Sequence, residues 1–326
     1  MQEPDATLPA NRAAHVQDDG DGIAILKIHR RRQMIDADVL DVVGQSVGLV
    51  AARFEGLVIV LDGAEDPIGL DIASLLLASN LAAWWAADSL IETGQRTFRA
   101  LETAPFPTVA AVLGEAVGGA CELALHCAAI QAAPDAKLGL SQVEAGLIPF
   151  WGGSTALAGR ALAGGGSGGD PIPGLADILN TIATARICQS AAEARALRLL
   201  GPNDGVSDHR DQVLADAKRL ARDLARDYAP PADPALALPG EVGLSHLIEI
   251  IEENRPDGPL AAADPVVLTE LAVVLTGGDV TSGSLIPIDD LRRLERGATN
   301  FLIQRPETQD RLARMVARDL APETEG

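Results

Sequence analysis

Continuous apolar runs that end in glycine- or proline-bearing turns constrain the fold of this chain most strongly. The clearest run is GLVIVLD at residues 56–62, and Thr108–Leu113 is another. Such runs lack polar alternation and are typical of strands that are buried on both faces, as in a parallel sheet. Segments of helical periodicity separate them, so the sequence predicts an α/β fold.

The same patterns predict the other elements up to about residue 175. Asp36 is placed to cap a helix whose apolar spacing continues to Val50. Residues 82–102 are a second helical stretch, which Pro105 and Pro107 end. Further strands are expected at residues 23–29 and 129–133, and a short helix at residues 120–127.

After about residue 175 the helical periodicity continues without further strands. Ser190 and Glu193 form a capping box that opens a helix. The proline-rich residues 229–239 indicate a linker. Later helices are expected at residues 211–228, 243–253, 265–275, 288–302 and 306–317.

We therefore expect three parts along the chain. Residues 1–20 are polar and acidic, lack the basic start and apolar centre of a signal peptide, and are expected to form a flexible tail. An α/β core at residues 21–205 and a helical C-terminal region at residues 206–326 follow.

The charge balance limits the partners that the chain can have. It carries 46 acidic and 26 basic residues, a net charge of −20 that repels nucleic acid and anionic membranes. Residues 70–91 are apolar, but Asp71, Asn80 and Asp88 interrupt them, which favours an internal helix over a membrane span. The odd count of three cysteines favours buried thiols in a reducing compartment over disulfides or a zinc site. We expect a cytoplasmic location.

The glycine-rich residues 164–169 match the dinucleotide pattern GxGxxG only through low complexity. They follow a helix instead of a strand, and no acidic residue is placed to bind a ribose. A flexible loop is the favoured interpretation, and neither a metal nor a nicotinamide cofactor is expected.

Gly118 and Gly119 open a short helix directly after a buried strand. The first amides of a helix have no partner within it, and the helix dipole is positive there. Glycines let a ligand approach that backbone, so the turn suits a developing oxyanion. Glu122 follows on the same helix and is expected near this opening. A tight strand-to-helix turn without chemistry is the alternative.

Two further segments supply polar groups. Residues 63–71 form a second turn after a buried strand, and its end begins another helix with free amides around Leu70. Two amide sources at neighbouring strand ends are what an oxyanion hole with two donors needs. Residues 138–153 are the third segment and carry Gln142 and Glu144 between apolar runs.

In this order and at these spacings, the three segments resemble the crotonase (enoyl-CoA hydratase/isomerase) superfamily. The likeness is greatest to the hydratase half of the bifunctional 3-hydroxyacyl-CoA dehydrogenases of fatty-acid oxidation. The dinucleotide-binding half of those fusions has no counterpart here. Further motifs that carry the likeness are Asp170-Pro-Ile-Pro173, Ile182-Ala-Thr-Ala185, Ser190-Ala-Ala-Glu-Ala-Arg195, Leu275-Thr-Gly-Gly-Asp279 with Ser282-Gly283, Leu294-Glu-Arg296 and Pro306-Glu-Thr-Gln309.

The resemblance implies a crotonase-type spiral of strand–helix turns followed by a helical C-terminal region. It implies trimers or hexamers for stand-alone members. It also implies that a bent acyl-CoA binds with its thioester oxygen held by the N–H groups of Leu70 and Gly119. Gly69, Asp71 and Gly118 are the neighbouring positions expected to contact this substrate, and coenzyme A enters only as part of it.

Hydratases of the family use two glutamates to add water across a 2,3-double bond. The matched motifs place the first at Glu122 and the second at Gln142, where this chain departs from the family. A carboxylate can deprotonate water, whereas an amide can only orient it. Glu144 is two residues away and, on a helix, faces another direction, with a local geometry that lets it substitute for the missing carboxylate as the alternative. The departure counts against isomerase activity even more than against hydratase activity.

The run His29-Arg-Arg-Arg32 follows the first strand, where the family contacts the phosphates and adenine of coenzyme A. His29, Arg30 and Arg32 are therefore expected to bind coenzyme A, with a solvated loop as the alternative. Trp151 is expected to pack in the core and is a candidate to line the acyl pocket. His126 is expected to be a core or surface residue and not a base.

Three functions follow from this pattern. The first is an enoyl-CoA hydratase-like lyase of acyl-CoA breakdown. The second is a catalytically weakened acyl-CoA-binding subunit that supports a separate 3-hydroxyacyl-CoA dehydrogenase. The third is another crotonase reaction, such as enoyl-CoA isomerisation or thioester hydrolysis.

Overall fold

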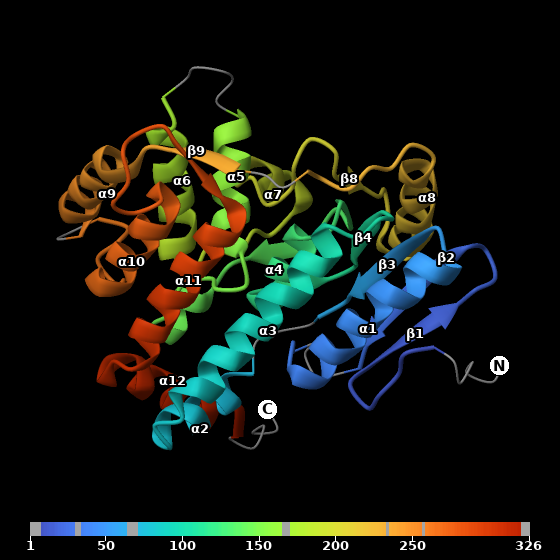
Figure 1. Ribbon diagram of the computed structural model, residues 1–326, viewed down its shortest axis with the longest axis horizontal. Helices are drawn as coiled ribbons and strands as arrows, with labels where there is room; N and C mark the ends of the chain where they lie inside the picture. Colours follow the sequence, from blue (N-terminus) through green and yellow to red (C-terminus); the bar gives the residue numbers. More distant parts are fainter. Residues whose placement is uncertain are drawn as a thin grey trace.

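A mixed sheet runs through one half of the computed structural model (Figure 1). The structure describes residues 8–29, 34–63, 71–164, 170–232, 235–255 and 258–320. The sheet has the strand order β1-β2-β3-β4-β6-β8, with β1 antiparallel to β2 and every other pair parallel. The strands are β1 (Ala14–Asp18), β2 (Ile23–Ile28), β3 (Gly56–Leu61), β4 (Thr108–Val112), β6 (Ala129–Ala132) and β8 (Gly205–Val206).

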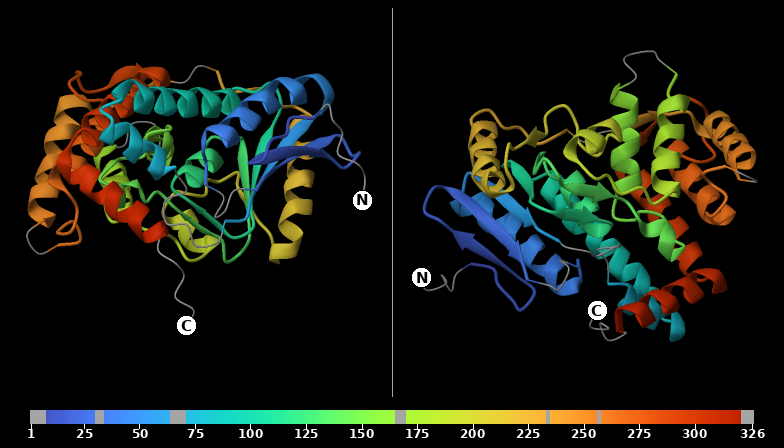
Figure 2. Two further views of the ribbon diagram at one scale, coloured as in Figure 1. Left: turned by 90° about the horizontal axis from the view of Figure 1, so that it is seen from below. Right: turned by 180° about the vertical axis from the view of Figure 1, so that it is seen from behind.

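The central strands are apolar because helices cover both faces of the sheet. Val58 of β3 lies opposite Ile25 of β2 and Val109 of β4, and all three side chains are fully buried. Helices α1 (Ala37–Arg53) and α3 (Trp84–Glu102) lie on one face, and α8 (Val213–Ala225) lies on the other (Figure 2). The predicted cap of α1 is confirmed, since Asp36 accepts a hydrogen bond of 2.9 Å from the Val39 amide.

A second, two-stranded sheet brings the site segments together. It pairs β5 (Glu115–Val117) in parallel with β7 (Lys137–Gly139). Each strand follows a strand of the main sheet along the chain, β5 after β4 and β7 after β6. Helix α4 (Gly119–Leu125) leaves β5, and the short 3₁₀ helix η2 (Gln142–Ala145) follows β7. The ends of the two small strands therefore deliver α4 and η2 to the same place.

The C-terminal helices pack on one another beside the main sheet, at the end of the molecule away from β1 (Figure 1). A two-stranded antiparallel sheet of β9 (Ala235–Leu238) and β10 (Ser284–Pro287) lies against them. The remaining elements are α2 (Ile72–Asn80), α5 (Gly153–Gly164), α6 (Ile172–Ala183), α7 (Ala191–Ala196), η3 (Arg210–Gln212), α9 (Gly240–Asn254), α10 (Pro265–Thr276), α11 (Ile288–Ile303) and α12 (Pro306–Leu320).

The α/β class and the late helices are confirmed. The expectation of no strands after about residue 175 is wrong, because β8, β9 and β10 lie there, and β9 falls in the expected linker. Two boundaries also differ from expectation. Part of the expected tail, residues 14–18, forms the edge strand β1, because Ala14 and Val16 alternate with polar residues and are buried. Helix α8 lies beyond residue 205 and yet packs on β3, β4 and β6. Its buried face is apolar, so α8 belongs to the layers of the sheet and not to the C-terminal helices.

Candidate active site

The turn between β5 and α4 has the backbone that the sequence suggested. Gly118 has φ 59° and ψ −122°, a conformation that L side chains avoid, and it stands at the N-cap of α4 without a side-chain cap. Its own N–H donates to the Gly139 carbonyl oxygen over 2.8 Å. Gly119 is the first residue of α4, and no hydrogen bond joins its N–H to another described residue.

The Glu122 carboxyl group is fully buried and is held by donors from other segments. Its Oε1 accepts hydrogen bonds from the Trp151 N–H (2.8 Å) and the Gly153 N–H (2.9 Å). Its Oε2 accepts a hydrogen bond from Nε2 of Gln142 (2.8 Å). Because main-chain donors fix Oε1, the carboxyl has one orientation, and Oε2 is the oxygen left for proton transfer.

The burial of this carboxyl changes its acidity. Loss of water, followed by the charge of Glu295, raises the pKa of Glu122 to about 8, while the Gly153, Trp151 and Gln142 donors lower it. Glu122 in the free protein is therefore mostly protonated at neutral pH. A carboxyl poised near neutrality is suited to general acid–base work.

Gln142 and Glu144 share η2 but not surroundings. Gln142 is fully buried and touches Glu122, whereas Glu144 is exposed. The loss of part of its hydration raises the pKa of the Glu144 carboxyl. Oε1 of Gln142 is buried and has no partner among the described residues. The structure therefore brings Gln142, and not Glu144, into contact with Glu122.

Trp151 contributes its main-chain amide to the site and its ring to the core. Only 1% of the side chain is exposed, and the indole makes edge contacts with Phe98 and Phe150. A Cβ on Gly94 would lie 2.1 Å from its Nε1, so the indole lies directly on α3. The packing role is confirmed, and the role in an acyl pocket stays a prediction.

His126 at the end of α4 has the expected core position. Its Nδ1 lies 2.7 Å from the carbonyl oxygen of Glu122, which can only accept, so Nδ1 carries the hydrogen. Burial, helped by the charge of Arg292, lowers the pKa of His126 to about 4. The ring is therefore neutral at physiological pH.

The other expected binding residues lie elsewhere or outside the described residues. Asp71 caps α2 and accepts a hydrogen bond of 3.0 Å from the Ser74 amide, which confirms a helix start there. His29 is exposed after β2 and stacks on His15 with ring centroids 4.6 Å apart. Four of the expected residues fall outside the described part of the chain, namely Leu70, Gly69, Arg30 and Arg32.

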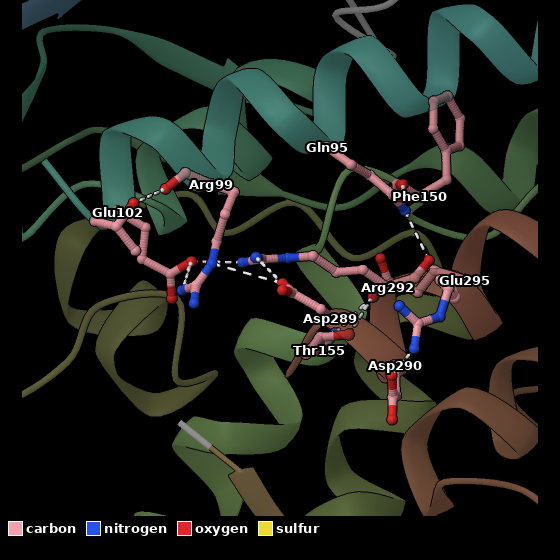
Figure 3. Close-up of polar contacts among 11 residues, drawn as sticks. Gln95, Arg99, Glu102, Phe150, Thr155, Asp289, Asp290, Arg292 and Glu295 are labelled. Carbon is pink, nitrogen blue, oxygen red and sulfur yellow. Dashed lines mark hydrogen bonds and ion pairs between the residues drawn. The ribbon is translucent and has the colours of Figure 1, made fainter. Parts of the chain in front are cut away.

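A second buried carboxyl, not expected from the sequence, lies near the first. Glu295 of α11 is fully buried, and its Oε1 accepts from the Thr155 N–H (2.7 Å) and the Thr155 hydroxyl (2.8 Å). Arg292, one turn earlier, pairs with Glu102 of α3 (Figure 3). The sequence signal is that Glu295 lies in phase with the apolar positions Leu291 and Ala298 of this helix.

Three other features bear on the chemistry. Cys121, Cys127 and Cys188 are buried and form no disulfide, as the sequence predicted. No cluster of His, Cys, Asp or Glu within the described ranges is arranged to hold a metal ion. None of the helices in the described part of the chain is long and apolar enough to span a bilayer.

Comparison with known proteins gives a consistent family. Residues 18–163 match the model of the enoyl-CoA hydratase/isomerase family. A probable 3-hydroxyacyl-CoA dehydrogenase of Bacillus subtilis is 30% identical over 319 residues, which cover 98% of this chain and 40% of that protein. A probable enoyl-CoA hydratase of the same organism is 42% identical over 172 residues, which cover 51% of this chain and 54% of that protein. The chain thus spans about half or less of these relatives' own lengths.

The solved structures add the fold. The crystal structure of a carnitinyl-CoA dehydratase from Mycobacterium thermoresistibile superposes with a TM-score of 0.66 at 13% identity. The match covers 97% of this chain and 94% of that one. At this level of identity the likeness concerns the fold alone, and the fold is of the crotonase type.

Proposed function

Because the chain carries an enoyl-CoA hydratase/isomerase domain of the crotonase superfamily, we propose that it binds an acyl-coenzyme A thioester and adds water across its 2,3-double bond. The observation that carries this proposal is the Glu122 carboxyl. It is buried and oriented by two main-chain donors, and a pKa of about 8 keeps it protonated at neutral pH.

In the proposed reaction, the main-chain N–H groups of Gly119 and Leu70 hold the thioester oxygen while negative charge develops on it. Protonated Glu122 gives its proton to the α-carbon, and the oxygen of water forms a bond to the β-carbon. Gln142 cannot take the remaining proton of that water, since an amide is no base near neutral pH. Glu122, now a carboxylate, takes this proton and is thereby restored.

This scheme explains why one carboxyl group can suffice and why the rate is expected to be modest. In a two-glutamate site the donor and the acceptor of protons are separate groups. Here Glu122 has to be both the donor and the acceptor of protons, and the amide of Gln142 only orients the Glu122 carboxyl group. General acid–base groups contribute about 10²–10⁴-fold each, so residual catalysis by Glu122 is expected.

A specific observation supports a second function, that of an acyl-CoA-binding subunit for a separate dehydrogenase. Gln142 donates into Glu122 where a second carboxylate would serve hydration. The chain also matches 40% of a relative named as a probable 3-hydroxyacyl-CoA dehydrogenase. In this role the thioester would bind without being hydrated at a useful rate.

Two measurements distinguish these functions. Calorimetric titration with acetoacetyl-CoA is expected to show saturable binding that weakens with salt under both proposals. Hydration of crotonyl-CoA, followed by the loss of enoyl absorbance, is expected only under the first. Absence of binding at millimolar ligand would contradict both, and turnover of another acyl-CoA without hydration would indicate a different crotonase reaction.

The basic residues after β2 supply the matched variants. Arg30→Ala with Arg32→Ala is expected to weaken the affinity for acetoacetyl-CoA and to reduce its salt dependence. Arg219→Ala with Arg226→Ala removes the same charge from α8 and its C-cap, where both arginines pair with neighbouring aspartates of α8. Equal losses in the two double variants would mean that only the net charge matters and not a coenzyme A site.

A further inference from the structure

Two buried carboxyl groups from distant parts of the chain meet at the first turn of helix α5. Glu122 of α4 accepts a hydrogen bond from the Gly153 N–H. Glu295 of α11 accepts one from the Thr155 N–H, and Figure 3 labels both of these residues. Both carboxyl groups are fully buried. The first-turn amides of one helix therefore serve two acids.

The donors available to the two acids are limited. A helix N-terminus offers about half a unit of positive charge, and its amides are the only ones without partners inside the helix. The first turn of α5 divides these donors between the two acids. Two full negative charges at this one terminus would exceed what it stabilises, because both carboxyl groups are fully buried.

We propose that Glu295 is a positioning residue that sets the protonation state of Glu122, because both carboxyl groups depend on the first turn of α5. The proposal rests on the proposed function only in taking Glu122 as the proton-transfer group. When Glu295 is ionised, its charge holds the proton on Glu122. The protein thereby keeps an acid ready for the α-carbon without a second glutamate at position 142.

The order of ionisation supports this arrangement. Thr155 donates both its N–H and its hydroxyl to Glu295, and Arg292 adds a favourable charge. Burial, opposed by these donors, raises the pKa of Glu295 to about 7. For Glu122, burial and then the charge of Glu295 raise the pKa to about 8. The Thr155 donors and the charge of Arg292 favour the ionised form of Glu295, and the charge of Glu295 in turn holds the proton on Glu122.

Other charged groups near the pair do not replace Glu295 in this role. Arg292 forms ion pairs with Glu102 and Asp289, and its Nε has no partner among the described residues. His126 is neutral, since its pKa is lowered to about 4. Other charged residues on the elements that pack around the pair include Arg99 on α3, Arg160 on α5, Glu270 on α10, Arg311 on α12 and Glu144 on η2. Arg99 donates to Glu102, Arg160 to the Arg198 carbonyl oxygen and Arg311 to the Val143 carbonyl oxygen.

The test is the titration of Glu122 itself in the Glu295→Gln variant. The amide oxygen of glutamine can still accept from Thr155, so the contact is kept while the charge is removed. Infrared spectroscopy follows the protonated carboxyl band, and the part that Glu122→Gln deletes is assigned to Glu122. In Glu295→Gln we expect the midpoint of this band to move to lower pH by at least about one unit.

A matched control removes a carboxyl charge elsewhere on the helices that pack on α11. Glu270 is half-buried on α10, so Glu270→Gln changes the net charge equally and leaves the Gly153 and Thr155 hydrogen bonds in place. It is expected to leave the Glu122 midpoint in place. If Glu295→Gln and Glu270→Gln give the same midpoint as the wild type, the proposal is overturned.

A second variant keeps the proposal testable if Glu295→Gln does not fold. Thr155→Val removes the hydroxyl donor of Glu295 and leaves the Thr155 N–H. Glu295 then holds its own proton more firmly, so the Glu122 midpoint is again expected at lower pH. An unchanged midpoint in a folded Thr155→Val protein, or a shift to higher pH, would contradict the proposal.

The infrared titration needs no substrate, so it separates two kinds of failure. If the wild type does not hydrate crotonyl-CoA but the midpoint moves as expected, the proposed function fails and the coupling of the two acids stands. If hydration occurs, its pH profile is expected to move with the infrared midpoint in Glu295→Gln. A profile that stays in place while kcat falls would mean that Glu295 has only a structural role.

Discussion

Gln142 donates its Nε2 hydrogen to Oε2 of Glu122, and its own Oε1 has no partner among the described residues. This pairing suits an ionised Glu122. When Glu122 carries a proton on Oε2, the amide can turn over, so that Oε1 accepts that hydrogen. The glutamine is therefore compatible with both forms of the acid.

The Gln142→Glu variant tests what this amide costs in catalysis. The introduced carboxyl would touch Glu122, and two buried acids in contact share one proton, which provides a separate base. We expect crotonyl-CoA hydration to rise by about 10²-fold, the lower end of a general base's contribution. Steady-state kcat at neutral pH is the measurement.

The double variant Gln142→Glu with Glu122→Gln is expected to lose this gain. Glu144→Gln serves as the matched control, because Glu144 is exposed on the same short helix. If the wild type already hydrates rapidly and Gln142→Glu slows it, glutamine takes part in a different mechanism.

The raised pKa of Glu122 predicts how stability depends on pH. Between its ordinary value of 4.5 and about 8, the folded state binds a proton that the unfolded state has released. The free energy of unfolding therefore falls as pH rises through this range, by about 1.4 kcal/mol per pH unit for this group. Urea unfolding at several pH values measures it.

Glu122→Gln removes the titrating group and is expected to flatten this pH dependence. Its amide oxygen can still accept from Trp151 and Gly153. Glu295 contributes a slope of the same sign up to about pH 7, so some dependence remains in the variant. A wild-type protein whose stability rises steadily across this range would contradict the assignment.

Gly119→Pro tests the proposed oxyanion donor with little damage to the helix. Gly119 is the first residue of α4, a position that tolerates proline because its N–H has no partner in the helix. Loss of this donor is expected to lower kcat by about 10²–10³-fold. Gly119→Ala keeps the N–H and is the control. Equal activity of a folded proline variant and the alanine variant would exclude Gly119 as a donor.

Gly94→Ala tests whether α3 fixes the position of Trp151. The added Cβ would lie 2.1 Å from Nε1 of the buried indole, so the ring or the helix has to move. Overpacking of this kind costs about 1–3 kcal/mol in unfolding free energy. Gly48→Ala on α1 is the control, since nothing lies within 4 Å of its added Cβ. Thermal unfolding compares the two, and only Gly94→Ala is expected to lower Tm.

Much of the fold follows from local patterns in the sequence. Apolar runs such as residues 56–62 are typical of buried strands. Asp36 could be expected to cap its helix, because the amide that it accepts from belongs to Val39, only three residues away. The edge strand β1 was missed because the acidic composition of residues 1–20 hid a short alternation of buried and polar positions. Burial decides such cases, and composition does not report it.

The site was predictable only in part, for a related reason. Glu122 and Gln142 lie in segments whose motifs resemble a family, so their pairing could be expected from the sequence. Glu295 is far away in the chain, and no local pattern links it to Thr155. Its position on the apolar stripe of α11 indicates a buried acid but not which helix terminus it meets.

During synthesis on the ribosome, helix α5 is made well before Glu295, with which its first turn forms hydrogen bonds. The strands of the main sheet and α8, up to Ala225, leave the ribosome before α11 is made. During that interval the Thr155 amide and hydroxyl lack their acceptor, and Gln95 lacks the Arg292 carbonyl to which it donates. Contacts at such separation form late. The nascent chain thus acquires its sheet first, and Glu122 reaches its final electrostatic setting only after α11 has emerged.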